Sequence, residues 1–119
     1  MYSATAMDHF LNPRNSGLLQ GADVGRGESD NPDCGDTAIF TLRLVDGVVA
    51  EVRFQSKGCA GAIAACSAAT EWLAGKTAAE ADTITPEAIA AALDGMPNAK
   101  HGCLVMAAVA SRGALATAS

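Results

Sequence analysis

The sequence of 119 residues has few aromatic side chains, few basic residues and no long hydrophobic run. Its aromatic residues are one Trp, one Tyr and three Phe, so the core must consist mainly of Ala, Val, Leu and Ile. Eight Lys and Arg stand against 13 Asp and Glu, which gives a formal net charge of −5. Nucleic-acid footprints are basic, so this balance argues against a nucleic-acid partner. No segment approaches the ~18 apolar residues of a membrane span, so we expect no membrane partner.

The sequence also lacks a secretory leader and the CxxC pairs of common zinc motifs. The first 20 residues contain neither a basic leader nor an uninterrupted apolar segment, so we expect a cytoplasmic protein. Thiols stay reduced in that compartment, so four cysteines indicate metal binding or catalysis rather than disulfides. At this point unrelated cysteines and a structural zinc site remain alternatives. The length predicts one domain over residues 1–119.

The first third of the chain predicts one short helix followed by a long irregular segment. The helix is expected over residues 2–11, because the chain reaches Pro13 and residues before proline avoid the helical conformation. His9 is expected on the surface of this helix. Residues 12–36 are rich in Gly, Asn, Asp and Pro, which predicts a loop with a short edge strand near residues 22–25.

The rest of the chain predicts a β-hairpin and then helices. Alternating apolar residues on both sides of the Asp-Gly pair at 46–47 are typical of two antiparallel strands joined by a tight turn. Small residues and capping signals then predict a helix from residue 60 to just before Gly75, a capping box at 77–80, a helix within 85–95 and a last helix over 103–116. Strands and helices occupy separate segments, so the expected fold class is α+β.

Three of the four cysteines lie where predicted elements begin. Cys34 lies in the turn-forming segment NPDCGD before the hairpin, and Cys59 and Cys103 each precede a helix. A glycine adjoins each of the three, and glycine lets other groups approach the backbone closely. Because helix N-termini favour anions, we expect Cys59 and Cys103 to have thiolate character, suited to metal binding or sulfur chemistry.

The positions of Cys66, Asp36 and His101 indicate which roles each of them can have. Cys66 lies inside a predicted helix, about 10 Å along the axis from Cys59, and is expected to be a packed and inert thiol. Asp36 is either an oxygen ligand or proton acceptor beside the first cysteine, or a turn residue that bonds its own backbone. His101 is either an imidazole ligand or a solvated residue at the start of the last helix.

Four segments, in this order, resemble the U-type iron–sulfur cluster assembly scaffolds, the family of IscU and the N-terminal domain of NifU. They are DHFLNPRNSG, NPDCGD, FQSKGCAGAIAACSAATEWLAGKT and MPNAKHGC, and the match extends over nearly the whole chain. The resemblance implies an α+β fold in which helices pack on a three-stranded antiparallel sheet. It also implies that Cys34, Cys59 and Cys103 gather at one exposed end, with Asp36 as the family aspartate.

The resemblance implies a scaffold and not an enzyme. A cysteine desulfurase would deliver sulfur as a persulfide, Fe²⁺ would enter, and a transient [2Fe–2S] cluster would form and pass to apo iron–sulfur proteins with help from an Hsp70-type chaperone pair. Cys34, Cys59, Cys103 and Asp36 would bind the cluster, with Cys103 as the persulfide acceptor and Asp36 promoting release. Three thiolates also bind Zn²⁺, so zinc in the isolated protein is a further expectation. A monomer or weak dimer is expected.

The chain departs from the family pattern at three places. Gly102 occupies the position of the histidine that usually precedes the third cysteine, so His101 lies one residue too early. The segment MPNAK differs from the usual chaperone-recognition motif. Cys66 replaces a small, serine-like residue. The alternative function is a zinc-dependent sulfur acceptor of the SufU branch, which carries an insertion between the second and third cysteines. Only 43 residues separate Cys59 from Cys103, which favours the cluster scaffold. A structural zinc module for protein contacts is a third candidate.

Overall fold

One antiparallel sheet and a set of helices make up the chain over residues 1–32 and 34–118, the part that the computed structural model describes. Asp33, within the NPDCGD segment, and Ser119 lie outside the described residues. The elements in chain order are α1 (Ala4–Leu11), β1 (Gly25–Asn31), β2 (Asp36–Val45), β3 (Val48–Lys57), α2 (Ala60–Leu73), α3 (Ala78–Ala81), α4 (Pro86–Ala92), the 3₁₀ turn η1 (Asn98–Lys100) and α5 (His101–Thr117). The expected α+β fold with a three-stranded antiparallel sheet is confirmed.

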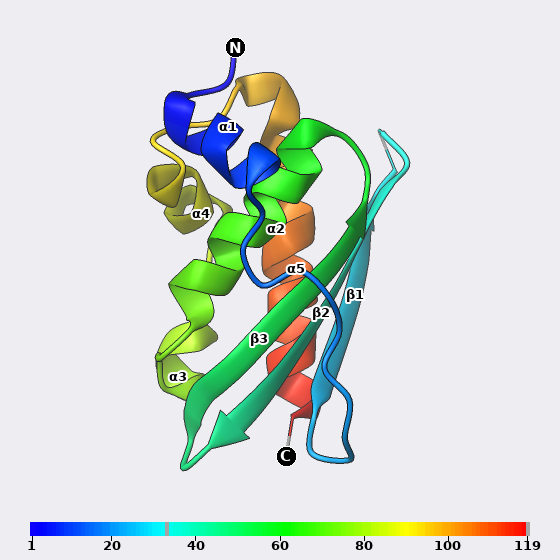
Figure 1. Cartoon of the computed structure of the whole chain (residues 1–119), viewed down its shortest axis with the longest axis vertical. Coiled ribbons are helices and arrows are strands. Elements are labelled where there is room, and N and C mark those ends of the chain that lie inside the picture. The colour runs from blue at the N-terminus through cyan, green and yellow to red at the C-terminus, as the bar shows by residue number, and fades with distance from the viewer. Residues whose placement is uncertain (33, 119) are drawn as a thin grey trace.

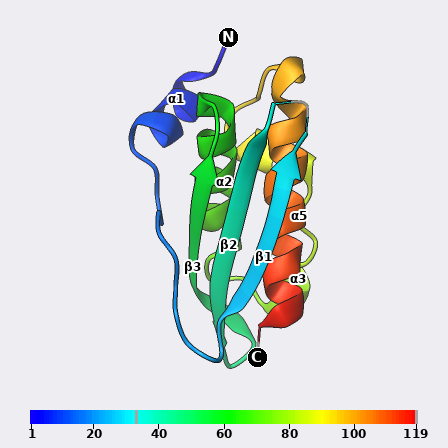
Figure 2. The same ribbon diagram turned by 90° about the vertical axis from the view of Figure 1, so that its right-hand side faces the viewer.

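The helices cover one face of the sheet. The strand order is β1-β2-β3, and α2 and α5 lie behind it, with α1 and α4 packed on the outer side of these two helices (Figures 1 and 2). The segment between α1 and β1 runs along β3, where Phe54 exchanges backbone hydrogen bonds with Asn15 and Gly17. The core contains large side chains from the sheet, small ones from α2, and both large and small ones from α5. Among them are Phe40, Leu42, Val52, Phe54, Ala65, Ala69, Leu104 and Met106.

The local signals for turns and caps are confirmed. The β2–β3 turn contains Asp46 and Gly47, both with positive φ, as a tight hairpin turn requires. Helix α2 ends at Leu73 and is followed by Gly75 in the left-handed conformation. The capping box of α3 and the Thr85 cap of α4, with Pro86 at its first position, are present. These features depend on neighbours within four residues, so the sequence alone predicts them.

The edge strand is where the prediction was wrong. A short strand near residues 22–25 was expected, but β1 runs from Gly25 to Asn31 and pairs along its whole length with β2. Its sequence GRGESDN shows no apolar alternation, because the side that faces α5 is formed by glycine backbone. A Cβ atom on Gly27 would lie 2.1 Å from the carbonyl oxygen of Ala110, and one on Gly25 would lie 2.0 Å from that of Ala114. The strand is thus buried by close backbone approach, which hydrophobic periodicity does not detect.

The last helix, α5, starts earlier than expected and packs on the side of β1 that contains Gly25 and Gly27. It begins at His101 instead of Cys103, directly after the 3₁₀ turn η1. Gly113 inside the helix faces the strand, since a Cβ atom there would lie 3.2 Å from the Cα atom of Gly27. Gly113 therefore serves the packing of α5 on β1.

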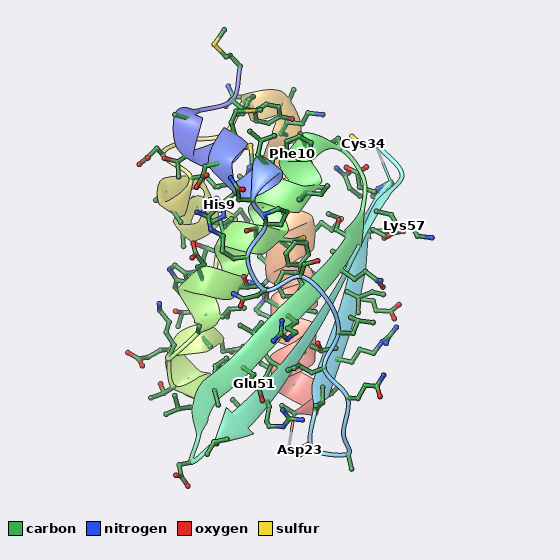
Figure 3. All side chains as sticks on the ribbon, in the orientation of Figure 1. His9, Phe10, Asp23, Cys34, Glu51 and Lys57 are labelled. Carbon is green, nitrogen blue, oxygen red and sulfur yellow. The ribbon has the colours of Figure 1, made fainter. Side chains whose placement is uncertain are left out.

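His9 lies in the interior, contrary to the expectation of a surface position. Its side chain is only 5% exposed, and its Nδ1 atom lies 2.8 Å from the hydroxyl of Ser67 on α2. The backbone N–H of Arg14 donates to the same hydroxyl, and Glu71 lies 3.4 Å from the imidazole Nε2. Burial, and then the nearby charge of Arg14, lower the pKa of His9 below the ordinary value of 6.5. Figure 3 shows the side chain pointing from α1 toward α2.

Within the described residues, the structure holds no helix that combines the length and the apolarity needed to cross a membrane.

Replacing Gly27 by Ala should destabilise the protein by about 3 kcal/mol, because the new methyl group collides with the backbone of α5. Urea unfolding of the metal-free protein, followed by circular dichroism, measures this change. Ser29→Ala is the matched control, since Ser29 lies on the same side of β1 and already carries a Cβ atom; it should change stability by less than about 0.5 kcal/mol. Equal stability of the two variants would contradict the packing described here.

Stability should fall in mildly acidic solution because of His9. Its folded-state pKa is below its unfolded value of 6.5, so its contribution is complete above pH 6.5 and is lost as the pH falls toward the lowered pKa. The slope is at most about 1.4 kcal/mol per pH unit for one group. Unfolding free energies between pH 7.5 and 5.5 should flatten in His9→Asn and keep the wild-type slope in His101→Asn, the exposed second histidine. An unchanged slope in His9→Asn would assign the effect to other groups.

Candidate functional site

Asp36, Cys59 and Cys103 meet at one end of the molecule, although they lie on three different elements. Asp36 begins β2, Cys59 is the N-cap of α2, and Cys103 lies in the first turn of α5. Figure 1 shows that the β1–β2 turn and the starts of α2 and α5 lie at the same end of the fold. One ligand atom from each of the three residues lies within 4.8 Å of the other two. We call these three residues the thiol–carboxylate group.

The carboxylate joins the two thiols within this group. Both donate to the same Asp36 oxygen, Oδ2, from Cys59 Sγ at 3.4 Å and from Cys103 Sγ at 3.8 Å. Asp36 is 4% exposed and Cys103 is fully buried, whereas Cys59 is partly open to solvent. Loss of the two thiol protons leaves two sulfur donors and one oxygen donor directed at a common point. Such a donor set fits Zn²⁺ and iron, both of which bind thiolates well.

Glycines beside the cysteines make this convergence possible. A Cβ atom on Gly58 would lie 2.6 Å from Cγ and Oδ1 of Asp36. A Cβ atom on Gly102 would lie 2.7 Å from the side-chain amide nitrogen (Nδ2) of Asn31, which is the last residue of β1. The departure from the family pattern at Gly102 thus has a local cause, because the buried Asn31 side chain takes the space that a larger residue would need.

Cys34 lies outside the thiol–carboxylate group. It is exposed in the turn between β1 and β2, and Figure 3 shows it at the tip of this hairpin, at the same end of the molecule. The carbonyl of Asn31 accepts hydrogen bonds from the N–H groups of Cys34 and Gly35, and Gly35 has a φ of +72°. The structure therefore brings together three of the four expected cluster ligands and leaves the fourth on a short turn beside them.

His101 also lies outside the group. It is exposed at the first position of α5 and lines a small cleft toward α4 together with Glu87 and Met96. Two residues along a helix correspond to a rotation of about 200°, so His101 and Cys103 point in nearly opposite directions. The conformation described here does not bring the imidazole to the thiols.

Cys103 differs most from the expectation of an accessible thiol with thiolate character. It is fully buried, and burial raises its pKa to about 12, with a further contribution from the neighbouring Cys59 and Asp36. Cys66 is packed in the interior as expected, and burial also raises its pKa to about 12.

Lys100 is the site residue that the sequence reasoning missed. Its Nζ atom lies 3.6 Å from the sulfur of Cys59. The charge of Cys59, followed by that of Tyr2, raises the pKa of this lysine. The only sequence signal was a basic residue three positions before the third cysteine, in a segment interpreted as a chaperone motif. The contact joins residues 41 positions apart, and local patterns do not reveal such contacts.

Comparison with known sequences shows extensive similarity. The family model described as the NifU-like N-terminal domain matches residues 1–118. The iron–sulfur cluster assembly scaffold protein IscU 1 of Archaeoglobus fulgidus is 46% identical over 115 residues, which is 97% of this chain and 74% of that protein. The IscU scaffold protein of Escherichia coli is 38% identical over 118 residues, 97% of this chain and 91% of that protein.

Comparison with solved structures shows the same fold. A candidate iron–sulfur cluster assembly scaffold protein for the SUF system of Fervidobacterium islandicum superposes with a TM-score of 0.80, at 21% identity over 96% of both chains. A NifU-like N-terminal protein of Brucella abortus gives a TM-score of 0.63 at 20% identity, over 92% of this chain and 76% of that one. At these identities the likeness concerns the fold alone.

Gly58→Ala should weaken metal binding, because the added methyl group displaces the Asp36 carboxylate from the two thiols. Gly58 does not have a positive φ, so alanine fits its backbone and the effect is specific to this contact. Loss of such a supporting arrangement typically costs about tenfold to 100-fold in metal affinity. Titration of the metal-free protein with Co²⁺, followed by thiolate-to-metal absorption, measures it. Lys57→Ala, an exposed neighbour, is the control, and equal affinities would show that Asp36 is not displaced.

Proposed function

Because the chain belongs to the NifU-like N-terminal domain family, we infer that it is an iron–sulfur cluster assembly scaffold. Such a protein holds a cluster as cargo and does not turn over a substrate. The convergence of Asp36, Cys59 and Cys103 carries the inference, because two thiols and a carboxylate at one end of the fold suit a cluster that must be bound and released. It occurs in a chain that is 38–46% identical to IscU scaffold proteins over 97% of its length.

The proposed cargo is a transient [2Fe–2S] cluster formed from Fe²⁺ and sulfur. Cys59, Cys103 and Asp36 supply three of its protein ligands from their present positions, and Cys34 supplies the fourth when the β1–β2 turn closes over the site. The exposure of Cys34 supports this order, because an open turn admits iron before the last thiolate binds. In our proposal, Cys34 is exposed so that iron can enter the site before this thiolate binds. His101, on the opposite side of α5, is not needed for this ligand set.

The sulfur is proposed to come from a cysteine desulfurase as a persulfide on a scaffold thiol. Each sulfur atom needs two electrons to become sulfide, so a reductant must take part. The family resemblance favours Cys103 as the acceptor, and this stays a prediction. Its sulfur is buried in the present conformation, so transfer to it requires the end of the molecule to open; Cys34 and Cys59 reach solvent without such a change.

Asp36 is proposed to promote release of the cluster. A carboxylate binds iron less firmly than a thiolate does. When the cluster has left and solvent has protonated the two sulfurs, the Oδ2 atom of Asp36 accepts hydrogen bonds from both thiols, and this favours the empty site. Removing Asp36 is therefore expected to slow transfer and not to prevent assembly.

The proposal also includes the acceptors, a chaperone pair, the metal of the isolated protein and its location. Apo iron–sulfur proteins receive the cluster, and the segment from Met96 to Lys100 is the place where an Hsp70-type chaperone pair would act. Zn²⁺ is expected to occupy the thiol–carboxylate group of protein purified in air. We propose a cytoplasmic location and a monomer or weak dimer.

Anaerobic reconstitution tests the proposed function. Metal-free protein is mixed with a cysteine desulfurase, cysteine, Fe²⁺ and a reductant, and visible absorption is followed. Sulfide-to-iron bands should grow in the wild type and in Cys66→Ala, and should be lost in Cys34→Ala, Cys59→Ala and Cys103→Ala. Asp36→Ala should form the bands and pass its cluster to an apo-ferredoxin several-fold more slowly.

Three outcomes would each contradict a part of the proposal. Absence of bands in the wild type, together with stimulation of desulfurase turnover by the zinc-loaded protein, would favour the SufU-like sulfur acceptor. Unchanged transfer from Asp36→Ala would leave Asp36 with a structural role only. Bands that persist in Cys34→Ala would show that the turn does not supply the fourth ligand.

A further inference from the structure

Lys100 lies beside the thiol–carboxylate group on the side of Cys59. Its Nζ atom is 3.6 Å from Cys59 Sγ, within hydrogen-bonding range for sulfur. The lysine is the last residue of η1, and its backbone N–H donates to the carbonyl of Pro97 at 2.8 Å. The turn thus fixes the direction in which the side chain leaves the backbone.

The aliphatic part of the side chain is held in place by Gly61. A Cβ atom on Gly61 would lie 3.3 Å from Cδ and 3.4 Å from Cγ of Lys100, and 3.0 Å from the hydroxyl of Tyr2. The lysine stem therefore lies against the first turn of α2, and a larger residue at position 61 would have to displace it. Lys100 is half-buried: its stem packs against α2, and its ammonium group lies at the edge of the site beside the Cys59 sulfur.

We propose that Lys100 is a positioning residue of the cluster site. Its ammonium group donates a hydrogen bond to the Cys59 sulfur when that sulfur is a metal-bound thiolate, and its charge offsets part of the negative charge of the loaded site. The first part needs only a metal bound to Cys59, whereas the second rests on the scaffold function proposed above.

Because the loaded site is negatively charged, Lys100 affects the reduction potential of the bound cluster. Three thiolates and one carboxylate carry four negative charges, and the oxidised [2Fe–2S] core carries two positive charges, so the site as a whole is an anion. One lysine offsets half of that excess. Reduction adds a further negative charge, so a cation at this distance favours the reduced state and raises the reduction potential.

A cobalt probe tests the hydrogen bond without any cluster. Co²⁺ bound to the metal-free protein gives a thiolate-to-metal charge-transfer band, whose energy rises when the thiolate accepts a hydrogen bond. Lys100→Met keeps the aliphatic stem against Gly61 and removes the donor, so the band should move to lower energy. Lys100→Arg should keep most of the wild-type band energy, because the guanidinium group also donates.

Lys57→Met is the matched control for loss of a lysine near the same end of the fold. Lys57 is exposed at the end of β3, and Figure 3 shows its side chain extending away from the protein. This variant should leave the cobalt band unchanged.

The reduction potential tests the electrostatic part in the reconstituted protein. Lys100→Met should lower the equilibrium constant for one-electron reduction by about tenfold, which corresponds to about 59 mV. Lys57→Met should change it much less, because exposed charges are screened by solvent and salt.

The outcomes separate the two proposals. A wild-type band energy in Lys100→Met, or an equal shift in Lys57→Met, would overturn the positioning role of Lys100. An unchanged potential in Lys100→Met would overturn its electrostatic part. A shifted cobalt band with no cluster formed even on the wild type would contradict the scaffold function while it supports the hydrogen bond from Lys100.

Discussion

The close approach of α5 to the backbone of β1 is the constraint on which the site depends. Gly25 and Gly27 have no side chains, so the backbone of α5 packs directly on the backbone of β1. Gly113 in α5 allows the same close contact from the helix. At the other end of α5, Gly102 lies against the Asn31 side chain at the end of β1. Cys103 then lies beside Asp36, and the absence of a side chain at Gly102 leaves room for Asn31. A bulkier residue at any of these contacts would separate the helix that carries one ligand from the strand that carries another.

The thiol–carboxylate group is assembled from the ends of elements. Asp36 opens a strand, Cys59 caps a helix without a side-chain hydrogen bond to it, and Cys103 lies in a first helical turn. The backbone groups of residues at such places make fewer of the regular hydrogen bonds of helices and strands. Their side chains can therefore point to one shared site. Lys100 reaches the same point from a 3₁₀ turn. The interior of the fold provides rigidity, and the chemistry lies at its edge.

The sequence predicts the parts of this structure that depend on near neighbours. The Asp46-Gly47 turn, the capping box at Thr77 and the start of α4 each depend on residues within four positions of one another. β1 was misplaced because its burial comes from backbone contact with α5, which lies far along the chain. His9 was misplaced because Ser67 accommodates it from another helix. The approach of Asp36 to Cys59 and Cys103 was expected from the family resemblance, whereas the burial of Cys103 and the contact of Lys100 needed the three-dimensional structure.

The distribution of the ligands over β2, α2 and α5 links cargo binding to folding. An ion or cluster held by Asp36, Cys59 and Cys103 joins the sheet to both of its covering helices, and this arrangement exists only in the folded chain. By mass action, cargo bound at 100 times its dissociation constant adds about 2.7 kcal/mol to the free energy of unfolding. The empty protein is then the more easily unfolded and the more readily digested form. Any cellular factor that recognises loosened chains would distinguish empty from loaded molecules without contacting the cluster.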